Sequence, residues 1–220
     1  MKTLRVFFIL LLTSYLQTGF AQESKPAMLY ANCENIVDFP YTYTENYRLE
    51  SDNGEVAFGE EKNTVIIRPN GTQAKCTISI YDGEKLIEQK DFAIRKAPNV
   101  RYALSLDGDR IDLEQGLSLQ SLDSTSQLAV DIVLPEEFIS QAPKDARFRV
   151  TEYAISIARG SGTIKTYLVR KPKPFALRSI LPLTQPGDRL LIQVRKLAQL
   201  NHRNQVSENA TEALMVLGLN

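Results

Sequence analysis

Short segments in which apolar and polar residues alternate, each ended by a turn signal, recur along most of this chain. Residues 75–81 alternate and stop at Asp82-Gly83, and residues 64–67 stop at Pro69-Asn70-Gly71. Alternation with a period of two is typical of strands buried on one face, and Gly, Pro and Asn supply the backbone conformations of tight turns. Helical periodicity is not found between these segments. We therefore predict an all-β protein.

The segments form two groups that meet near Lys96-Ala97-Pro98. Each group has the strand spacing of a small antiparallel β-sandwich, so we predict two consecutive β domains, over residues 31–98 and 99–220. Expected strands of the first are 45–49, 55–58, 64–67, 75–81 and 86–94. Those of the second are 102–106, 111–113, 128–134, 147–158, 163–169, 189–194 and 212–217, with a β-bulge near Thr151-Glu152, a hairpin turn at Gly160-Ser161-Gly162, a helical turn within 175–181 and a polar loop over 199–209.

Residues 1–21 have the anatomy of a secretory signal peptide. Lys2 and Arg5 precede the apolar run 6–12, and the small residues Gly19 and Ala21 occupy positions −3 and −1 of a cleavage site. The run is shorter than the ~20 apolar residues that span a bilayer, and no later run is long enough. We expect cleavage after residue 21, a linker over 22–30, and a mature protein without a transmembrane segment in the periplasm or at the cell surface of a diderm bacterium.

The two cysteines of the chain are candidates for a disulfide. Export places them in an oxidising compartment, where paired cysteines are commonly oxidised. Cys76 shares the apolar face of its alternating segment, and Cys33 shares a face with Val37. We expect a Cys33–Cys76 bridge. The alternative is a pair of buried free thiols.

The residue content excludes most catalytic sites. The chain has no Trp, one His and two Cys, too few for a zinc site, and a Ser-His-Asp triad would need the single imidazole. That residue, His202, lies in a polar segment, and we interpret it as a solvated loop residue. Asp107, Asp109 and Asp112 are spaced like calcium ligands but lack the later Glu of a binding loop, so we interpret them as a hairpin turn. We expect no catalytic residue, metal or cofactor.

Charge is unevenly distributed along the second predicted domain. Residues 144–203 hold 13 basic and 3 acidic residues, whereas residues 99–143 hold 2 and 8. This asymmetry indicates a basic face, unless acidic strands lie beside the basic ones and neutralise them. Prolines at 172 and 174 stiffen its densest part, which is either a contact surface for an acidic partner or ordinary edge protection. Its candidate partner-binding residues are Lys165, Arg170, Lys171, Lys173 and Arg178. Nucleic acid is not an expected partner.

Several ordered segments are similar to the GldM/PorM family, the periplasmic shaft proteins of gliding motility and type IX secretion. Those that resemble its Ig-like third domain are residues 35–36, 47–54, 65–69, 75–80 and 92–98, and those that resemble its C-terminal domain are residues 128–132, 148–157 and 181–188 with the closing loop and strand. The resemblance implies two β domains, Ig-like in the first, that pair with copies of themselves and contact an outer-membrane-associated ring. The family's inner-membrane helix and first two periplasmic domains are replaced here by the signal sequence.

Two functions fit these observations. The first is an exported, non-enzymatic interaction protein that binds envelope proteins, secretion-ring components or a second copy through β-edge pairing or a charged face. It would be a free-standing relative of the shaft tip, an accessory of the secretion or gliding machinery. The second is a soluble polysaccharide-binding or inhibitory module, for which Tyr41, Tyr43 and Tyr47 would supply a stacking platform. A hydrolase that uses His202 ranks third.

Overall fold

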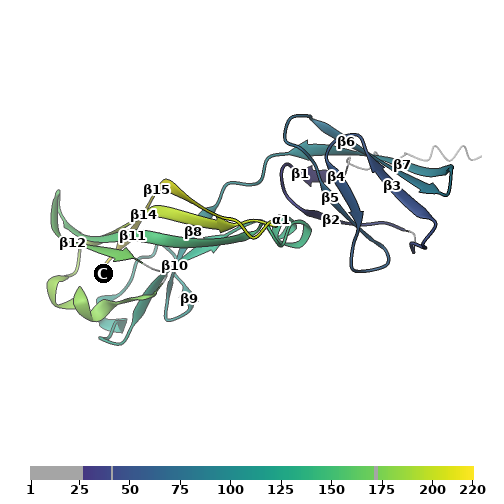
Figure 1. Cartoon of the computed structure of the whole chain (residues 1–220). Helices are drawn as coiled ribbons and strands as arrows, with labels where there is room; N and C mark the ends of the chain where they lie inside the picture. The colour runs from purple at the N-terminus through teal and green to yellow at the C-terminus, as the bar shows by residue number, and fades with distance from the viewer. Residues whose placement is uncertain (1–26, 41, 171–172) are drawn as a thin grey trace, which may run out of the picture.

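The computed structural model describes residues 27–40, 42–170 and 173–220, which form an all-β protein with one short α-helix. Two β-rich units follow one another along the long axis of the molecule, and the chain passes once from one to the other near residues 96–100 (Figure 1). Each unit has its own apolar core. Within the described ranges, no helix combines the length and the hydropathy needed to cross a membrane.

The N-terminal unit is built from two sheets that face each other. One sheet has the order β1-β7-β6-β3 and the other the order β2-β5-β4. All pairings are antiparallel except that of β1, which runs parallel to β7. The strands are β1 (Met28–Tyr30), β2 (Asn35–Asp38), β3 (Tyr47–Ser51), β4 (Glu55–Phe58), β5 (Thr64–Arg68), β6 (Lys75–Asp82) and β7 (Lys85–Arg95).

The core of this unit follows from the alternation in its strands. In β6 the residues Cys76, Ile78 and Ile80 are buried, while those between them are partly exposed, because successive side chains point to opposite faces of a strand. Val65 and Ile67 of the facing sheet pack against the same cluster. Strand β1 lies within residues 22–30, so the last part of the expected linker belongs to this sheet.

The C-terminal unit also consists of two sheets, of orders β13-β10-β8-β9 and β12-β11-β14-β15. The first contains β8 (Arg101–Leu106), β9 (Asp109–Arg110), β10 (Gln127–Val133) and β13 (Phe175–Ala176). The second contains β11 (Arg147–Arg159), β12 (Gly162–Arg170), β14 (Arg189–Leu200) and β15 (Val206–Gly218). Between strands lie the helix α1 (Glu136–Gln141) and the 3₁₀ turns η1 (Leu119–Ser121), η2 (Leu177–Ser179) and η3 (Leu181–Leu183).

The core of the C-terminal unit lies between its two sheets. Leu104 and Leu128 come from the first sheet, and Ile155, Ile192 and Leu217 from the second; all five are fully buried. The long strands β11, β14 and β15 extend past this core toward the N-terminal unit (Figure 1). Because these strands are long, the end of the second sheet at Leu200 and Val206 reaches the region where the two units are in contact, which we call the joint.

Several sequence predictions for this unit are confirmed. The hairpin between β11 and β12 turns at residues 160–161, and 3₁₀ turns occupy 177–179 and 181–183. The register of β11 with β14 shifts on both sides of Glu152, which is the predicted bulge.

Other predictions for the C-terminal unit are wrong. The polar residues 199–209 are mostly strand, because β14 and β15 pair out to Leu200 and Val206 and leave only 201–205 as a turn. The strand expected at 111–113 is instead the two-residue β9, and α1 was not expected at all. Two turns of helix are too short to show a periodicity that sequence reading can separate from a loop.

Candidate functional site

A third, small apolar cluster joins the two units. Tyr30 and Cys33 come from the N-terminal unit, and Phe138 and Ala142 come from α1 and its end; all four are buried. The rings of Tyr30 and Phe138 meet edge to face, with centroids 4.7 Å apart. Arg95 closes one side of the cluster, because its guanidinium lies 4.3 Å from the Tyr30 ring centroid and pairs with Glu137.

The loop that presents Cys33 and Glu34 is fixed by the buried side chain of Asn35. The Asn35 Nδ2 group donates hydrogen bonds to the carbonyl oxygens of Tyr30, Cys33 and Ile67, and its Oδ1 accepts from the Tyr30 N–H. An amide side chain carries both an acceptor oxygen and a donor NH₂ group, so it can serve the donors and the acceptors of such a turn. This loop is therefore held in one conformation against strand β5.

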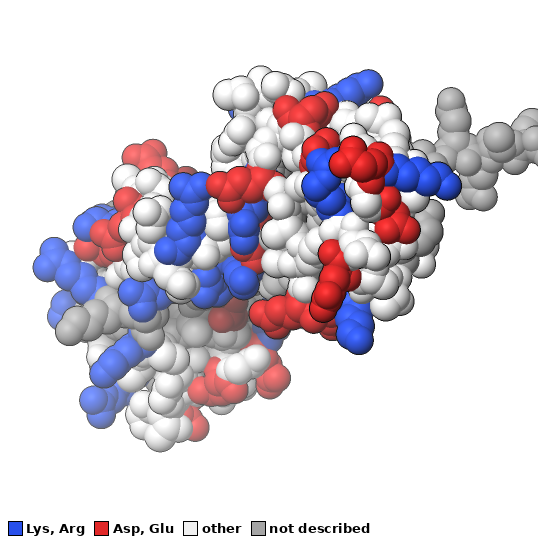
Figure 2. Space-filling model, turned by 45° about the vertical axis from the view of Figure 1, so that its right-hand side comes forward, with Lys and Arg blue, Asp and Glu red and all other residues white. Residues whose placement is uncertain are grey.

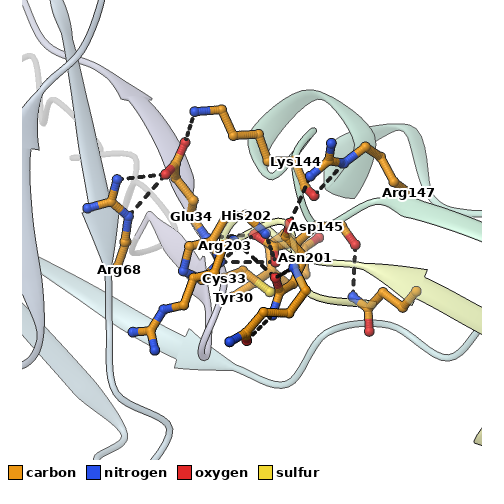
Figure 3. A network of polar contacts seen from close by, with 12 residues as sticks. Tyr30, Cys33, Glu34, Arg68, Lys144, Asp145, Arg147, Asn201, His202 and Arg203 are labelled. Carbon is orange, nitrogen blue, oxygen red and sulfur yellow. Dashed lines mark hydrogen bonds and ion pairs between the residues drawn. The ribbon is translucent and has the colours of Figure 1, made fainter. Parts of the chain in front are cut away.

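Glu34 is only 3% exposed and binds a cation from each unit. Arg68 of β5 donates from Nε at 3.0 Å and from Nη2 at 2.7 Å to one carboxylate oxygen, and Lys144 Nζ lies 2.8 Å from the other (Figure 3). Burial alone would raise the pKa of Glu34, but hydrogen bonds and charge attraction from Lys144 and Arg68 outweigh it and lower this pKa below its ordinary value. Glu34 thus links the two units as an ionised carboxylate.

Asp145, which is 1% exposed, is the second buried carboxylate of the joint. It accepts hydrogen bonds from the backbone N–H of Glu34 at 2.8 Å and from the backbone N–H of His202 at 3.1 Å. The Nδ1 atom of His202 lies 3.1 Å from the same carboxylate oxygen. Because an ionised carboxylate only accepts, Nδ1 carries a proton in this pair. Asp145 therefore connects the N-terminal loop, the end of α1 and the β14–β15 turn (Figure 3).

The interpretation of His202 as a solvated loop residue is wrong. Its side chain is 10% exposed, and its Nε2 atom is buried without a hydrogen-bond partner. The extension of β14 and β15 places the turn at 201–205 against the joint, where Arg147 Nη2 donates to the Asn201 carbonyl oxygen. The single imidazole of the chain is thus a packing and hydrogen-bonding group of the joint.

A thiol, that of Cys33, also lies in the joint. Cys33 is buried, so that desolvation, followed by the nearby charge of Asp145, raises its pKa to about 12. A thiol with so high a pKa is not a thiolate near neutral pH. Within residues 27–40, 42–170 and 173–220, no group of three acidic, His or Cys side chains could hold a metal ion. The arrangement fixes two units relative to each other.

The predicted disulfide is wrong: Cys33 and Cys76 are free and buried in different places. Cys33 belongs to the cluster between the units, whereas Cys76 lies in the core of the N-terminal unit. The Cys76 thiol has its own partners, since its sulfur lies 3.4 Å from both Ser51 Oγ and the Asn53 carbonyl oxygen. Each cysteine lies on the apolar face of its own segment, but the two faces pack into different apolar clusters, so the two sulfurs do not meet.

Four of the five candidate partner-binding residues fall within the described part of the C-terminal unit. Lys165 and Arg170 are on β12; Lys165 Nζ lies 4.9 Å from the Tyr167 ring centroid, and Arg170 Nε lies 3.3 Å from a Glu152 oxygen. Arg178 is in η2. Figure 2 shows Lys and Arg side chains gathered over the part of the C-terminal unit that lies away from the N-terminal unit.

Lys173 belongs to the segment between β12 and β13. The Lys173 carbonyl oxygen accepts a hydrogen bond from the Tyr153 hydroxyl, which ties the segment after β12 to the core. Lys171 lies outside the described residues, as do the signal sequence and Tyr41.

Tyr43 and Tyr47, the two described members of the expected tyrosine platform, pack among neighbouring aromatic side chains. The Tyr43 hydroxyl is buried without a hydrogen-bond partner, and desolvation raises its pKa well above the ordinary value. Its ring packs against Phe58 and Tyr47, with centroids 4.6 and 5.9 Å apart. These aromatic residues flank the core of the N-terminal unit.

Among the described residues, no other strand pairs with either edge of the second sheet of the C-terminal unit. Strands β12 and β15 stand at the ends of the order β12-β11-β14-β15. At the end of β15, the Leu117 N–H donates to the Gly218 carbonyl oxygen. Exposed apolar side chains accompany both edges: Ile164 and Leu168 on β12, Leu214 and Val216 on β15. The charges of β12 were among the candidate partner-binding residues, whereas the strand expected at 212–217 was not singled out as an edge.

A scan against protein-family models finds no match to this chain, and a search of curated proteins finds none. The resemblance to the GldM/PorM family therefore rests on the sequence segments named above.

Proposed function

We propose that the protein is an exported, non-enzymatic interaction module whose C-terminal unit binds an envelope protein through the exposed edges of its second sheet. The observation that carries the proposal is the pair of open edge strands β12 and β15. An edge strand displays unpaired N–H and C=O groups, whose natural partner is another strand. The joint of Glu34, Asp145 and His202 supports a passive role, because it holds the two units together without leaving a reactive group.

The place of action is part of the same proposal. The signal-like pattern of residues 1–21 supports export, and the likeness to the GldM/PorM segments supports an accessory role beside the secretion or gliding machinery. The basic side chains of β12, Lys165 and Arg170, give the binding edge a preference for an acidic strand or surface.

Cross-linking in intact native cells, followed by affinity purification of the tagged chain and mass spectrometry, tests this function. The decisive variant carries Lys165→Glu and Arg170→Glu. A matched control carries Lys62→Glu and Lys85→Glu, the same charge change at two exposed residues of the N-terminal unit.

We expect the wild-type and control chains to recover the same envelope protein and the β12 variant to lose most of it. Equal recovery by all three chains, or recovery of no envelope protein, contradicts the proposal. A specific saccharide that raises the melting temperature of all three chains alike would instead support a ligand-binding module.

A further inference from the structure

The open edges β12 and β15 are the two ends of one four-stranded antiparallel sheet. An even number of antiparallel strands leaves the two edge strands running in opposite directions. When the β12 edge of a second, equally oriented copy is placed beside β15, the new pair is therefore also antiparallel. The sheet can continue from copy to copy without any reversal of strand direction.

The register of the sheet fixes how the two edges would meet. On its outer face one row runs straight across all four strands, from Leu168 through Ala154 and Gln193 to Leu214. Continuing this row without a shift places Leu214 opposite Leu168 of the next copy. Both side chains are exposed in the single chain, Leu168 by 43% and Leu214 by 61%, so the pairing would bury two apolar groups that now contact water.

The same register matches charge and size at neighbouring positions. Two residues along the strands, Glu212 of β15 faces Arg170 of the next copy, and in the other direction Val216 faces Thr166. On the inner face Met215 comes opposite Tyr167. β12 carries two basic and no acidic residues, and β15 carries two acidic and no basic residues, so the two edges attract each other.

We propose that the open β15 edge binds the β12 edge of a second copy of this chain, in the register that sets Leu214 against Leu168, and that the copies associate head to tail. This names the partner of the edges in the proposed function and rests on that function. A head-to-tail contact uses two different surfaces, so each copy keeps one free edge and assembly continues as an open series or a ring. A two-fold dimer, in contrast, would pair an edge with itself.

Single cysteines placed in the exposed row test both the pairing and its register. One preparation carries Leu168→Cys and the other Leu214→Cys, and the two are mixed under mild oxidation. Residues directly opposite in an antiparallel pair have Cα atoms about 4.5–5.5 Å apart, within the span of a disulfide. The native thiols are buried and do not compete. The control mixture pairs Ile164→Cys with Glu208→Cys, which this register does not set opposite each other.

We expect a covalent dimer from the Leu168→Cys and Leu214→Cys mixture and little from the control mixture or from either variant alone. A chain that carries both substitutions should give a ladder of higher oligomers. Sedimentation of the wild-type chain should show a mass that rises with concentration and falls as salt screens the Glu212–Arg170 pair.

Three results would overturn the proposal: no dimer in the matched mixture, equal dimer in the control mixture, or efficient dimer from one variant alone, which indicates a two-fold contact. If cross-linking fails while the tagged wild-type chain still captures an envelope protein that the β12 variant loses, the edge serves another protein. In that case the proposed function stands and the self-assembly is excluded.

Discussion

Asp145→Ala should destabilise the joint between the two units more than any other single polar truncation there. The carboxylate of Asp145 is 1% exposed and accepts from two backbone N–H groups, those of Glu34 and His202, and from the His202 imidazole. Alanine leaves both backbone donors buried without an acceptor, and each such donor costs about 1–3 kcal/mol. We therefore expect a loss of about 2–5 kcal/mol in the free energy of unfolding.

Urea unfolding followed by circular dichroism measures this loss, and thermal unfolding should show a decrease in Tm of about 5–15 °C for a chain of this size. The two units lose a shared contact, so we also expect the single transition to separate into two. Asp131→Ala, which truncates an exposed carboxylate on β10, is the matched control. A cost for Asp145→Ala no larger than the ~0.5 kcal/mol typical of surface changes would refute the reasoning.

Three other predictions follow from the described contacts. Acidification should lower the free energy of unfolding through Glu34, because the pKa of Glu34 in the folded chain lies below its ordinary value. The stabilisation by Glu34 is complete above the pKa of the unfolded chain and is lost as the pH falls through the pKa of the folded chain. Glu34→Gln should flatten this part of a pH titration of stability, and an unchanged slope would contradict the assignment. Alkylation should find Cys33 and Cys76 unreactive in the native protein and both reactive in denaturant; a mass two hydrogens lower with no reactive thiol would mean that they are bridged. Gly54→Ala should lower the free energy of unfolding by about 1–3 kcal/mol, because φ is +95° and the new Cβ would lie 2.2 Å from a backbone oxygen. Gly83 has φ +59° and open space around it, so Gly83→Ala should cost about 1 kcal/mol. Equal denaturation midpoints for the two glycine variants would show that the close approach is relieved at no cost.

The all-β class could be predicted from local pattern because the period-two alternation of segments such as 75–81 is imposed by burial of one face. The Thr151-Glu152 bulge was visible for the same reason, since a bulge shifts the phase of the apolar positions. Strand ends were harder to predict. β14 and β15 continue through polar residues because they pair with each other, and the exposed residues 206–210 of β15 show no apolar alternation that would indicate a strand.

The joint could not be predicted from the sequence. Glu34 and Asp145 are 111 positions apart, and the His202 imidazole reaches Asp145 across 57 positions. A buried carboxylate looks the same in sequence as an exposed one, and a His among polar residues looks solvated. The signal that could have indicated burial is indirect: the short apolar pair Phe138 and Ala142, one helical turn apart, indicates a buried helix face, which residues of both units cover.

The long strands of the second sheet connect the joint with the open edges. β14 and β15 meet at the His202 turn beside the N-terminal unit, and the same β15 presents Glu212, Leu214 and Val216 along the free edge. A strand held at the joint and packed in the core keeps its edge extended, which lowers the entropy that a partner strand would have to pay on binding. Loosening the joint with Asp145→Ala should therefore weaken capture at the β15 edge less than charge reversal of Glu212, because the core residues Met215 and Leu217 still fix the strand where the partner binds. A joint variant that abolished edge binding while the C-terminal unit stayed folded would show that the N-terminal unit itself forms part of the contact.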